Sequence, residues 1–183
     1  MSKLFIPLIL GTGREGRQSE HVAKFIFDLL SQREEIETQF VDVRDFAFPV
    51  TRVKDERSKP WLEIADRADG YLIVSPEYNH GYPGELKILL DQAEDEYDNK
   101  PVGVCGVSSG GLGGARMVEG LLPVFRTLGF WAIPETLYVS SVEKTFVGGV
   151  LQDDSYVAKA QKFIDALIEH TNRFKIIRKT NSL

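Results

Sequence analysis

The chain has 183 residues, a length typical of a single domain that can bury its own hydrophobic core. Its composition, 43% hydrophobic and 27% charged, excludes a disordered, a collagen-like or a disulfide-stapled chain. The formal net charge of −5 argues against broad nucleic-acid binding, which needs a basic surface.

The first half of the chain alternates short apolar runs with segments of helical period. Residues 4–10 predict a buried strand. They are too few for a membrane span and lack the basic start of a signal peptide. Residues 36–43 predict a second strand, and a short helix is expected from about 59 to 68. Between the two strands an amphipathic helix is indicated by apolar residues at i, i+3, i+4, i+7 and i+8, namely Val22, Phe25, Ile26, Leu29 and Leu30.

The second half repeats this alternation. Residues 71–75, 102–107 and 130–139 predict the third, fourth and fifth strands, and Pro134 points to an edge position or a break in the last of them. Helical periodicity follows Pro83 and recurs at residues 114–128, where Pro123 should interrupt or kink the helix. A final helix is marked by Val157, Ala160, Ile164, Leu167 and Ile168, and a basic tail begins at about 171.

The only cysteine, Cys105, lies inside the fourth predicted strand, where a core role is favoured over a nucleophilic one. One cysteine allows no internal disulfide, which fits a cytoplasmic protein. The three histidines show no metal-ligand spacing, so no metal site is expected. The helix at 114–128 is apolar on two faces, which predicts a subunit interface there.

Five strands separated by helices predict an α/β fold in one domain over residues 1–183. Such a chain forms a doubly wound parallel sheet with helices on both faces. Ligands of these sheets bind at the carboxyl ends of the strands. Glycine-rich or polar loops follow the first, third and fourth predicted strands, so these three loops are the candidate site.

The first loop, residues 11–19, allows two functional interpretations. Its segment 11–16 matches the dinucleotide motif G-x-G-x-x-G, with Asp42 as the candidate ribose ligand. In that motif the helix begins within the glycine turn, whereas the polar segment 17–19 intervenes here and Ser19 is the predicted N-cap. A longer loop with hydroxyls and two arginines suits a terminal phosphate better. A plain surface turn remains an alternative.

The second loop, residues 75–84, presents aromatic and amide groups on which a planar ligand could stack. The third loop follows the fourth strand, and its segment 106–110 reads as the G-x-S-x-G hydrolase elbow. The glycines continue through Gly114, and the only downstream histidine, His170, lies in the last helix, so a hydrolase is disfavoured. Four glycines instead let the backbone approach a flat ligand. A purely structural turn remains the alternative for the second loop, and a flexible loop remains the alternative for the third.

At these three loops the sequence resembles the NAD(P)H-dependent FMN reductase family. Residues 75–87 (SPEYNHGYPGELK) are similar to that family's PEYN…PG.LK segment. The first loop resembles its G-[S/T]-x-R…S phosphate loop, and the third resembles its S-x-G…GG segment. The resemblance extends from the first strand to about Val139. It implies a flavodoxin-like fold with strand order 2-1-3-4-5, assembled as a homodimer or homotetramer.

The resemblance also implies which residues bind the cofactor. The FMN phosphate would be held by Thr12, Arg14, Arg17, Gln18 and Ser19. The isoalloxazine ring would lie on Pro76, Glu77, Tyr78 and Asn79, bordered by Ser108, Gly110 and Gly111. Thr12, Tyr82 and Gln92 depart from the residues most common in the family, the last two near the acceptor pocket and the interface.

The expected function is transfer of electrons from NADPH or NADH through bound FMN to a small acceptor such as a flavin, quinone, azo compound or metal oxyanion. The chemistry belongs to the flavin, so no catalytic side chain is expected. Neither a nucleic acid nor a membrane is an expected partner. The alternatives are a flavodoxin-like electron carrier without enzymatic activity, a domain that binds NAD(P) alone, and a structural or regulatory protein with an empty fold.

Overall fold

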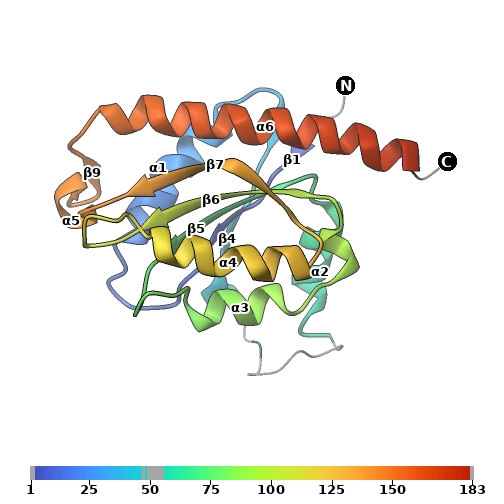
Figure 1. Ribbon diagram of the computed structural model, residues 1–183, viewed down its shortest axis with the longest axis horizontal. Helices are drawn as coiled ribbons and strands as arrows, with labels where there is room; N and C mark the ends of the chain where they lie inside the picture. The colour runs from blue at the N-terminus through green and yellow to red at the C-terminus, as the bar shows by residue number, and fades with distance from the viewer. Residues whose placement is uncertain (1–2, 47, 49–55, 182–183) are drawn as a thin grey trace.

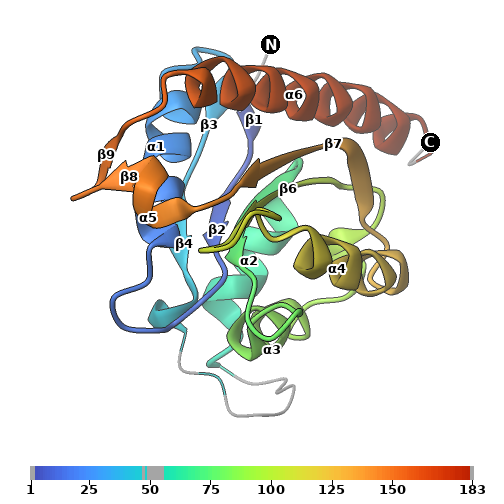
Figure 2. The ribbon, with the colours of Figure 1, turned by 60° about the vertical axis from the view of Figure 1, so that its left-hand side comes forward.

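A central sheet lies between two layers of helices (Figures 1 and 2). This computed structural model describes residues 3–46, 48 and 56–181. The sheet is all-parallel with strand order β4-β2-β5-β6-β7, which confirms the predicted order 2-1-3-4-5. Its strands are Leu8–Leu10 (β2), Phe40–Asp42 (β4), Tyr71–Pro76 (β5), Pro101–Val107 (β6) and Trp131–Val139 (β7).

The first two predicted strands are each divided into two pieces. β1 (Leu4–Phe5) pairs with β3 (Ile36–Glu37), and β2 then pairs with β4. Pro7 separates β1 from β2 because it has no N–H to donate to a ladder. The second strand ends at Asp42, and Val43 begins a short 3₁₀ turn over Val43–Asp45 (η1). The expectation of two unbroken strands was therefore wrong.

Each face of the sheet carries its own hydrophobic core. Helices α1 (Ser19–Ser31) and α6 (Ser155–Asn181) cover one face. Helices α2 (Lys59–Arg67), α3 (Gly84–Leu90) and α4 (Ala115–Thr127) cover the other. In α1 the buried side chains Val22, Ile26 and Leu30 recur every four residues, so a single stripe of the helix meets the sheet. Cys105 is fully buried in the core, and burial raises the pKa of its thiol.

The chain after residue 170 is helical. Helix α6 continues to Asn181 and projects past the end of the sheet (Figure 1), so the basic segment that begins at about 171 is part of this helix. Two basic side chains hold this extension. Lys175 Nζ lies 2.7 Å from Asp69 Oδ2, and Arg178 Nη1 donates to the Asn99 carbonyl at 2.8 Å.

Each of the two prolines that were expected to disturb a strand or helix lies inside that strand or helix. Pro134 lies in β7, an edge strand whose register with β6 shifts between Val102 and Val104, as the sequence predicted for an edge or a break. Pro123 lies inside α4, which continues past it to Thr127. A second 3₁₀ turn, η2 (Asp95–Tyr97), precedes β6.

A short helix and a hairpin follow β7, and the sequence did not predict them. These are α5 (Val142–Thr145) and the antiparallel strands β8 (Phe146–Val147) and β9 (Val150–Leu151). Figure 2 shows them beside α1, at the end of the sheet where β6 and β7 finish. No helix in the described part of the chain has the length and apolar character needed to span a bilayer.

Candidate functional site

A cleft of about 230 Å³ opens at the carboxyl ends of the strands, where the three predicted loops meet. Eight of the predicted contact residues line it: Arg14, Arg17, Gln18, Ser19, Pro76, Glu77, Tyr78 and Ser108. Gly16, Val107, Ser109, Val142 and Glu143 also line it. Thr12 is buried behind the cleft, while Asn79, Gly110 and Gly111 are exposed outside its lining.

Ser19 lies at the start of α1 with its hydroxyl pointing to no partner. Its side chain is buried, and Ser19 Oγ has no hydrogen-bond acceptor or donor within reach. The predicted N-cap was wrong, because Gln18 occupies the cap position and no side chain caps the helix. A buried hydroxyl without a partner costs about 1–3 kcal/mol, so the site is suited to a ligand that supplies one. The positive end of the α1 dipole favours an anionic ligand at the same place.

Arg17 is bound within the protein on several sides. Its guanidinium donates to Asp42 Oδ1 at 2.9 Å, to Asp42 Oδ2, to the Thr12 carbonyl and to Glu20 Oε2 at 3.2 Å. Its side chain is only 2% exposed. Arg17 therefore connects the first loop to the end of β4. Its contact with a phosphate remains a prediction.

Asp42 receives two guanidinium groups, because Arg44 Nη2 also lies 2.7 Å from its Oδ2. Burial alone would raise the pKa of Asp42, but the hydrogen bonds from Arg17 and Arg44 outweigh it and hold that pKa well below its usual range. A carboxylate engaged in this way is poorly placed to bind a ribose. This geometry disfavours the dinucleotide interpretation of the first loop.

Tyr78 joins the first loop to the second. Thr12 Oγ1 donates to the Tyr78 hydroxyl at 3.3 Å, and the Arg14 guanidinium lies 5.5 Å from the centre of the Tyr78 ring. The Arg14 backbone N–H in turn donates to Thr12 Oγ1 at 3.3 Å. Arg14 itself is exposed at the mouth of the cleft. The first and second loops are therefore connected to each other through Tyr78.

The tip of the second loop is a strained tight turn. Tyr78 and Gly81 exchange two backbone hydrogen bonds of 2.9 Å, and the two residues between them have φ of 48° (Asn79) and 68° (His80). This left-handed region is uncommon for residues other than glycine, and such strain is concentrated at functional sites. Both residues are exposed at the turn, and neither belongs to the cleft lining.

The third loop folds back over the end of β6. A Cβ placed on Gly106 would lie 2.5 Å from the Gly113 carbonyl oxygen, so only glycine fits beneath the loop. Ser108 Oγ donates to the Gly110 carbonyl at 3.0 Å, whereas His170 Nε2 lies 3.8 Å from Glu135 Oε2 on β7. The serine of the G-x-S-x-G match thus has no histidine partner in the described structure. No cluster of side chains suited to a metal ion occurs among the described residues.

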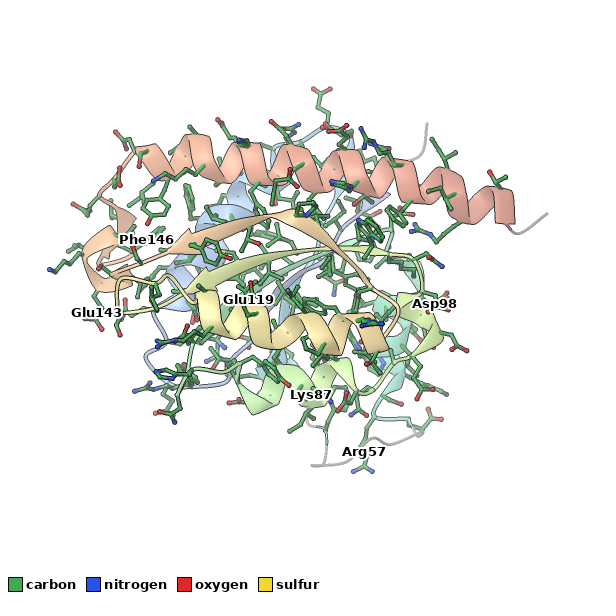
Figure 3. The ribbon with its side chains drawn as sticks, in the orientation of Figure 1. Arg57, Lys87, Asp98, Glu119, Glu143 and Phe146 are labelled. Carbon is green, nitrogen blue, oxygen red and sulfur yellow. The ribbon has the colours of Figure 1, made fainter. Side chains whose placement is uncertain are left out.

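Sequence reasoning missed the wall formed by Val142 and Glu143. Both belong to α5, and Figure 3 labels Glu143 at the end of the molecule where the cleft opens. A usable signal was present, because these residues follow the carboxyl end of the fifth strand and ligands bind at such ends. The sequence showed no glycine pattern there to draw attention to them.

Comparison with solved structures places the fold. The chain superposes on the flavoenzyme NAD(P)H:acceptor oxidoreductase FerB of Paracoccus denitrificans with a TM-score of 0.81 at 21% identity, covering 93% of this chain and 98% of that one. A flavodoxin variant from Pseudomonas aeruginosa gives a TM-score of 0.60 at 19% identity, covering 90% and 99%. These neighbours show that the fold is flavodoxin-like.

Comparison of sequences supplies the family. The chain is 30% identical to an NAD(P)H-dependent FMN reductase of Schizosaccharomyces pombe over 80% of this chain and 78% of that protein. It is 28% identical to an NAD(P)H-dependent FMN reductase of Saccharomyces cerevisiae over 67% and 74%. An FMN-dependent NADPH-azoreductase of Staphylococcus haemolyticus is 25% identical over 90% and 94%. The profile of the NADPH-dependent FMN reductase family matches residues 6–144. The chain therefore belongs to the NADPH-dependent FMN reductase family and is an oxidoreductase of that type.

Proposed function

We propose that the chain binds FMN in this cleft and uses it to pass electrons from NADPH or NADH to a small acceptor. The observation that carries the proposal is the buried Ser19 hydroxyl, which has no partner and lies at the positive end of α1. A phosphate group is the ligand chemistry that satisfies both features, since it accepts hydrogen bonds and carries negative charge. FMN ends in such a phosphate.

The residues around the cleft fit the rest of the molecule. Ser19, Gln18 and Arg14 would bind the phosphate, and Arg17 would keep their loop in place through Asp42. Pro76 and Tyr78 would support the flat ring, and the third loop with Ser108 would border its edge. Glu143 also lines the cleft, and its carboxylate would accept hydrogen bonds from the sugar-alcohol hydroxyls.

The size of the cleft bears on which part of FMN it encloses. At about 230 Å³ it is smaller than pockets that enclose a whole ligand, which hold about 300–1,000 Å³. We expect the phosphate end to be enclosed and the ring to remain accessible on the second and third loops. Donor and acceptor could then use the same open face in turn.

FMN, when bound, supplies a group that accepts a hydride from a reduced nicotinamide and releases its electrons to an acceptor. The chain's part is to bind, orient and shield that group. The proposed acceptor is a small molecule such as a flavin, a quinone, an azo compound or a metal oxyanion. A reduced nicotinamide donor and a single unpaired thiol both suit a reducing compartment, so we propose the cytoplasm as the place of reaction.

An absorbance spectrum tests the proposal directly. FMN is added to the purified protein, excess is removed, and NADPH and then NADH are introduced without oxygen. Retained flavin that loses its colour supports the reductase. Retained flavin that keeps its colour with both donors would instead favour an electron carrier, the role suggested by the fold shared with a flavodoxin. No retained flavin at any concentration would overturn the proposal.

A further inference from the structure

An ion pair between Glu77 and Arg116 ties the second loop to the start of α4. Arg116 Nε donates to Glu77 Oε1 at 2.7 Å, and Arg116 Nη2 contacts the same oxygen. The other carboxylate oxygen, Oε2, accepts from the Arg116 backbone N–H at 3.2 Å. One carboxylate therefore binds the side chain and the backbone of a residue 39 positions away.

The backbone part of this contact is a helix cap supplied from another loop. Arg116 lies in the first turn of α4, where backbone N–H groups have no acceptor within the helix. The N-cap residue of α4, Gly114, has φ of 85°, and a Cβ there would lie 2.8 Å from the Val107 nitrogen. The α4 N-terminus is thus pressed against β6, and Glu77 completes its hydrogen bonding.

The two side chains of this ion pair differ in how far they are buried. The Glu77 side chain is 5% exposed and lines the cleft, whereas the Arg116 side chain is 47% exposed and lies outside the cleft lining. Glu77 is held at the other end as well, because its backbone N–H donates to the Val107 carbonyl at 2.9 Å. Without Arg116 the site would contain a buried carboxylate that has lost its countercharge, which is costly.

We infer that Arg116 is a positioning residue for the flavin ring, acting through Glu77. It holds the second loop, with Pro76 and Tyr78 on either side of Glu77, against the third loop. It therefore sets the surface on which the ring lies. Glu77 was expected to be a direct ring contact, but its carboxylate is already engaged by α4. The inference rests on the proposed function, because it concerns the ring half of the same cleft.

The two halves of the cleft can be tested separately with FMN and riboflavin, which share the ring but differ in the phosphate. Dissociation constants come from quenching of flavin fluorescence by the flavin-free protein. We expect Arg116→Ala to lower the affinities for FMN and for riboflavin by the same factor of about ten. A change of this size is common for directly interacting groups. Ser19→Ala should lower the affinity for FMN and leave the affinity for riboflavin unchanged. This split distinguishes positioning of the ring from contact with the phosphate.

Action through Glu77 is tested by a double-mutant cycle. In a Glu77→Gln background, Arg116→Ala should change riboflavin affinity by less than about threefold, because the pair is already weakened. Arg116→Lys keeps one positive charge but loses the planar fork, so it should restore part of the affinity that Arg116→Ala loses. Hydrogen exchange of the flavin-free Arg116→Ala protein should speed up at residues 76–82 and 108–116.

The matched control is Arg173→Ala, which removes the same side chain from the exposed Arg173–Glu169 pair on α6 and should leave both affinities unchanged. A loss confined to FMN in Arg116→Ala would mean that Arg116 acts on the phosphate, and would overturn the inference. Full additivity with Glu77→Gln, or unchanged riboflavin affinity in a folded Arg116→Ala protein, would also overturn it. If the wild-type protein binds neither flavin, the proposed function fails first and the inference fails with it.

Discussion

Two neighbouring side chains of the first loop have opposite environments at the residue scale. Arg17 is held by Asp42, Glu20 and a carbonyl group, while Ser19 has a buried hydroxyl without any partner. The first arrangement stabilises the protein without a ligand, and the second is satisfied only when a ligand arrives. Arg17 therefore holds the loop in place, while Ser19 stays available to bind a ligand.

Ser19→Ala should separate stability from binding. Removing an unpartnered buried hydroxyl should leave the free energy of unfolding of the flavin-free protein unchanged or raise it by up to about 1 kcal/mol. The same change should lower the affinity for FMN about tenfold, since a hydrogen bond to a charged group contributes about 1.5–3 kcal/mol. Urea unfolding and fluorescence titration measure the two effects. Ser31→Ala, at the other end of α1, is the control and should leave FMN affinity unchanged.

Asp42→Asn should make the protein less stable in a pH-dependent way. The folded-state pKa of Asp42 is held below its ordinary value of 3.8, so its carboxylate adds stability above about pH 4 that is lost as the pH falls further. At pH 7 we expect the variant to lose about 3 kcal/mol, because the buried Arg17 loses its bidentate countercharge and keeps only Glu20.

Urea unfolding from pH 7 to pH 3 checks this dependence, and the difference from wild type should shrink below about pH 4. Glu169→Gln, which breaks an exposed pair, should cost less than about 1 kcal/mol. A difference for Asp42→Asn that stays constant across the range would contradict the assigned cause.

At the scale of elements, the site is built from loops that elements hold in place. The first loop is held by β4 through Asp42, and the second is held by α4 through Arg116. The third loop lies close over the end of β6, and its Gly110 carbonyl accepts from the Ser141 N–H at 3.0 Å. The long α6 plays a different part, since its last turns pack beside the amino-terminal end of the sheet, away from the cleft.

The extension of α6 should depend on Asp69. This side chain accepts from the Phe5 N–H at 3.1 Å and from Lys175 at 2.7 Å, and it is only 14% exposed. Asp69→Ala should lower the free energy of unfolding by about 2 kcal/mol, because a buried donor and a cation both lose their acceptor. Hydrogen exchange at residues 171–181 should also become faster.

Asp165→Ala is the control for Asp69. It removes an equally close partner of Arg33, at 2.7 Å, from a surface where the carboxylate is 55% exposed. Exposed pairs contribute little, so its cost should stay below about 1 kcal/mol. Equal losses in the two variants would mean that Asp69 has no special role.

At the scale of the whole molecule, helix α4 bears on how copies of the chain assemble. The sequence predicted a subunit interface on the helix at 114–128. In the structure α4 buries one face, while Leu122 stays 39% exposed on the other. A homodimer or homotetramer through α4 stays a prediction.

Sedimentation velocity at micromolar concentration tests the assembly. The wild type should sediment as a dimer or tetramer, and Leu122→Lys should shift it to a smaller species because a charge is placed in an apolar contact. Ile176→Lys, on the 67% exposed side chain of α6, should leave the species unchanged. A wild type that is monomeric at every concentration would refute the prediction.

The three loops predicted from the sequence meet at one cleft. Ser19, Tyr78 and Ser108 line the cleft as expected, because loops at the carboxyl ends of parallel strands must meet at one edge. Asn79 lies in a left-handed turn and is exposed outside the cleft lining, so its contact with the ring stays a prediction. Glu143 was missed because nothing in the local sequence distinguishes α5.

The sequence by itself determined the order of the five sheet strands and of the five helices that cover the sheet, because periodicity records which side of each segment is buried. It also determined which loops carry polar and glycine residues. Only the tertiary structure decided the partners of the charged side chains. Arg17 and Asp42 are 25 residues apart, Glu77 and Arg116 are 39 apart, and Asp69 and Lys175 are 106 apart. No local pattern encodes such pairs, since they form only when the sheet brings distant strand ends together.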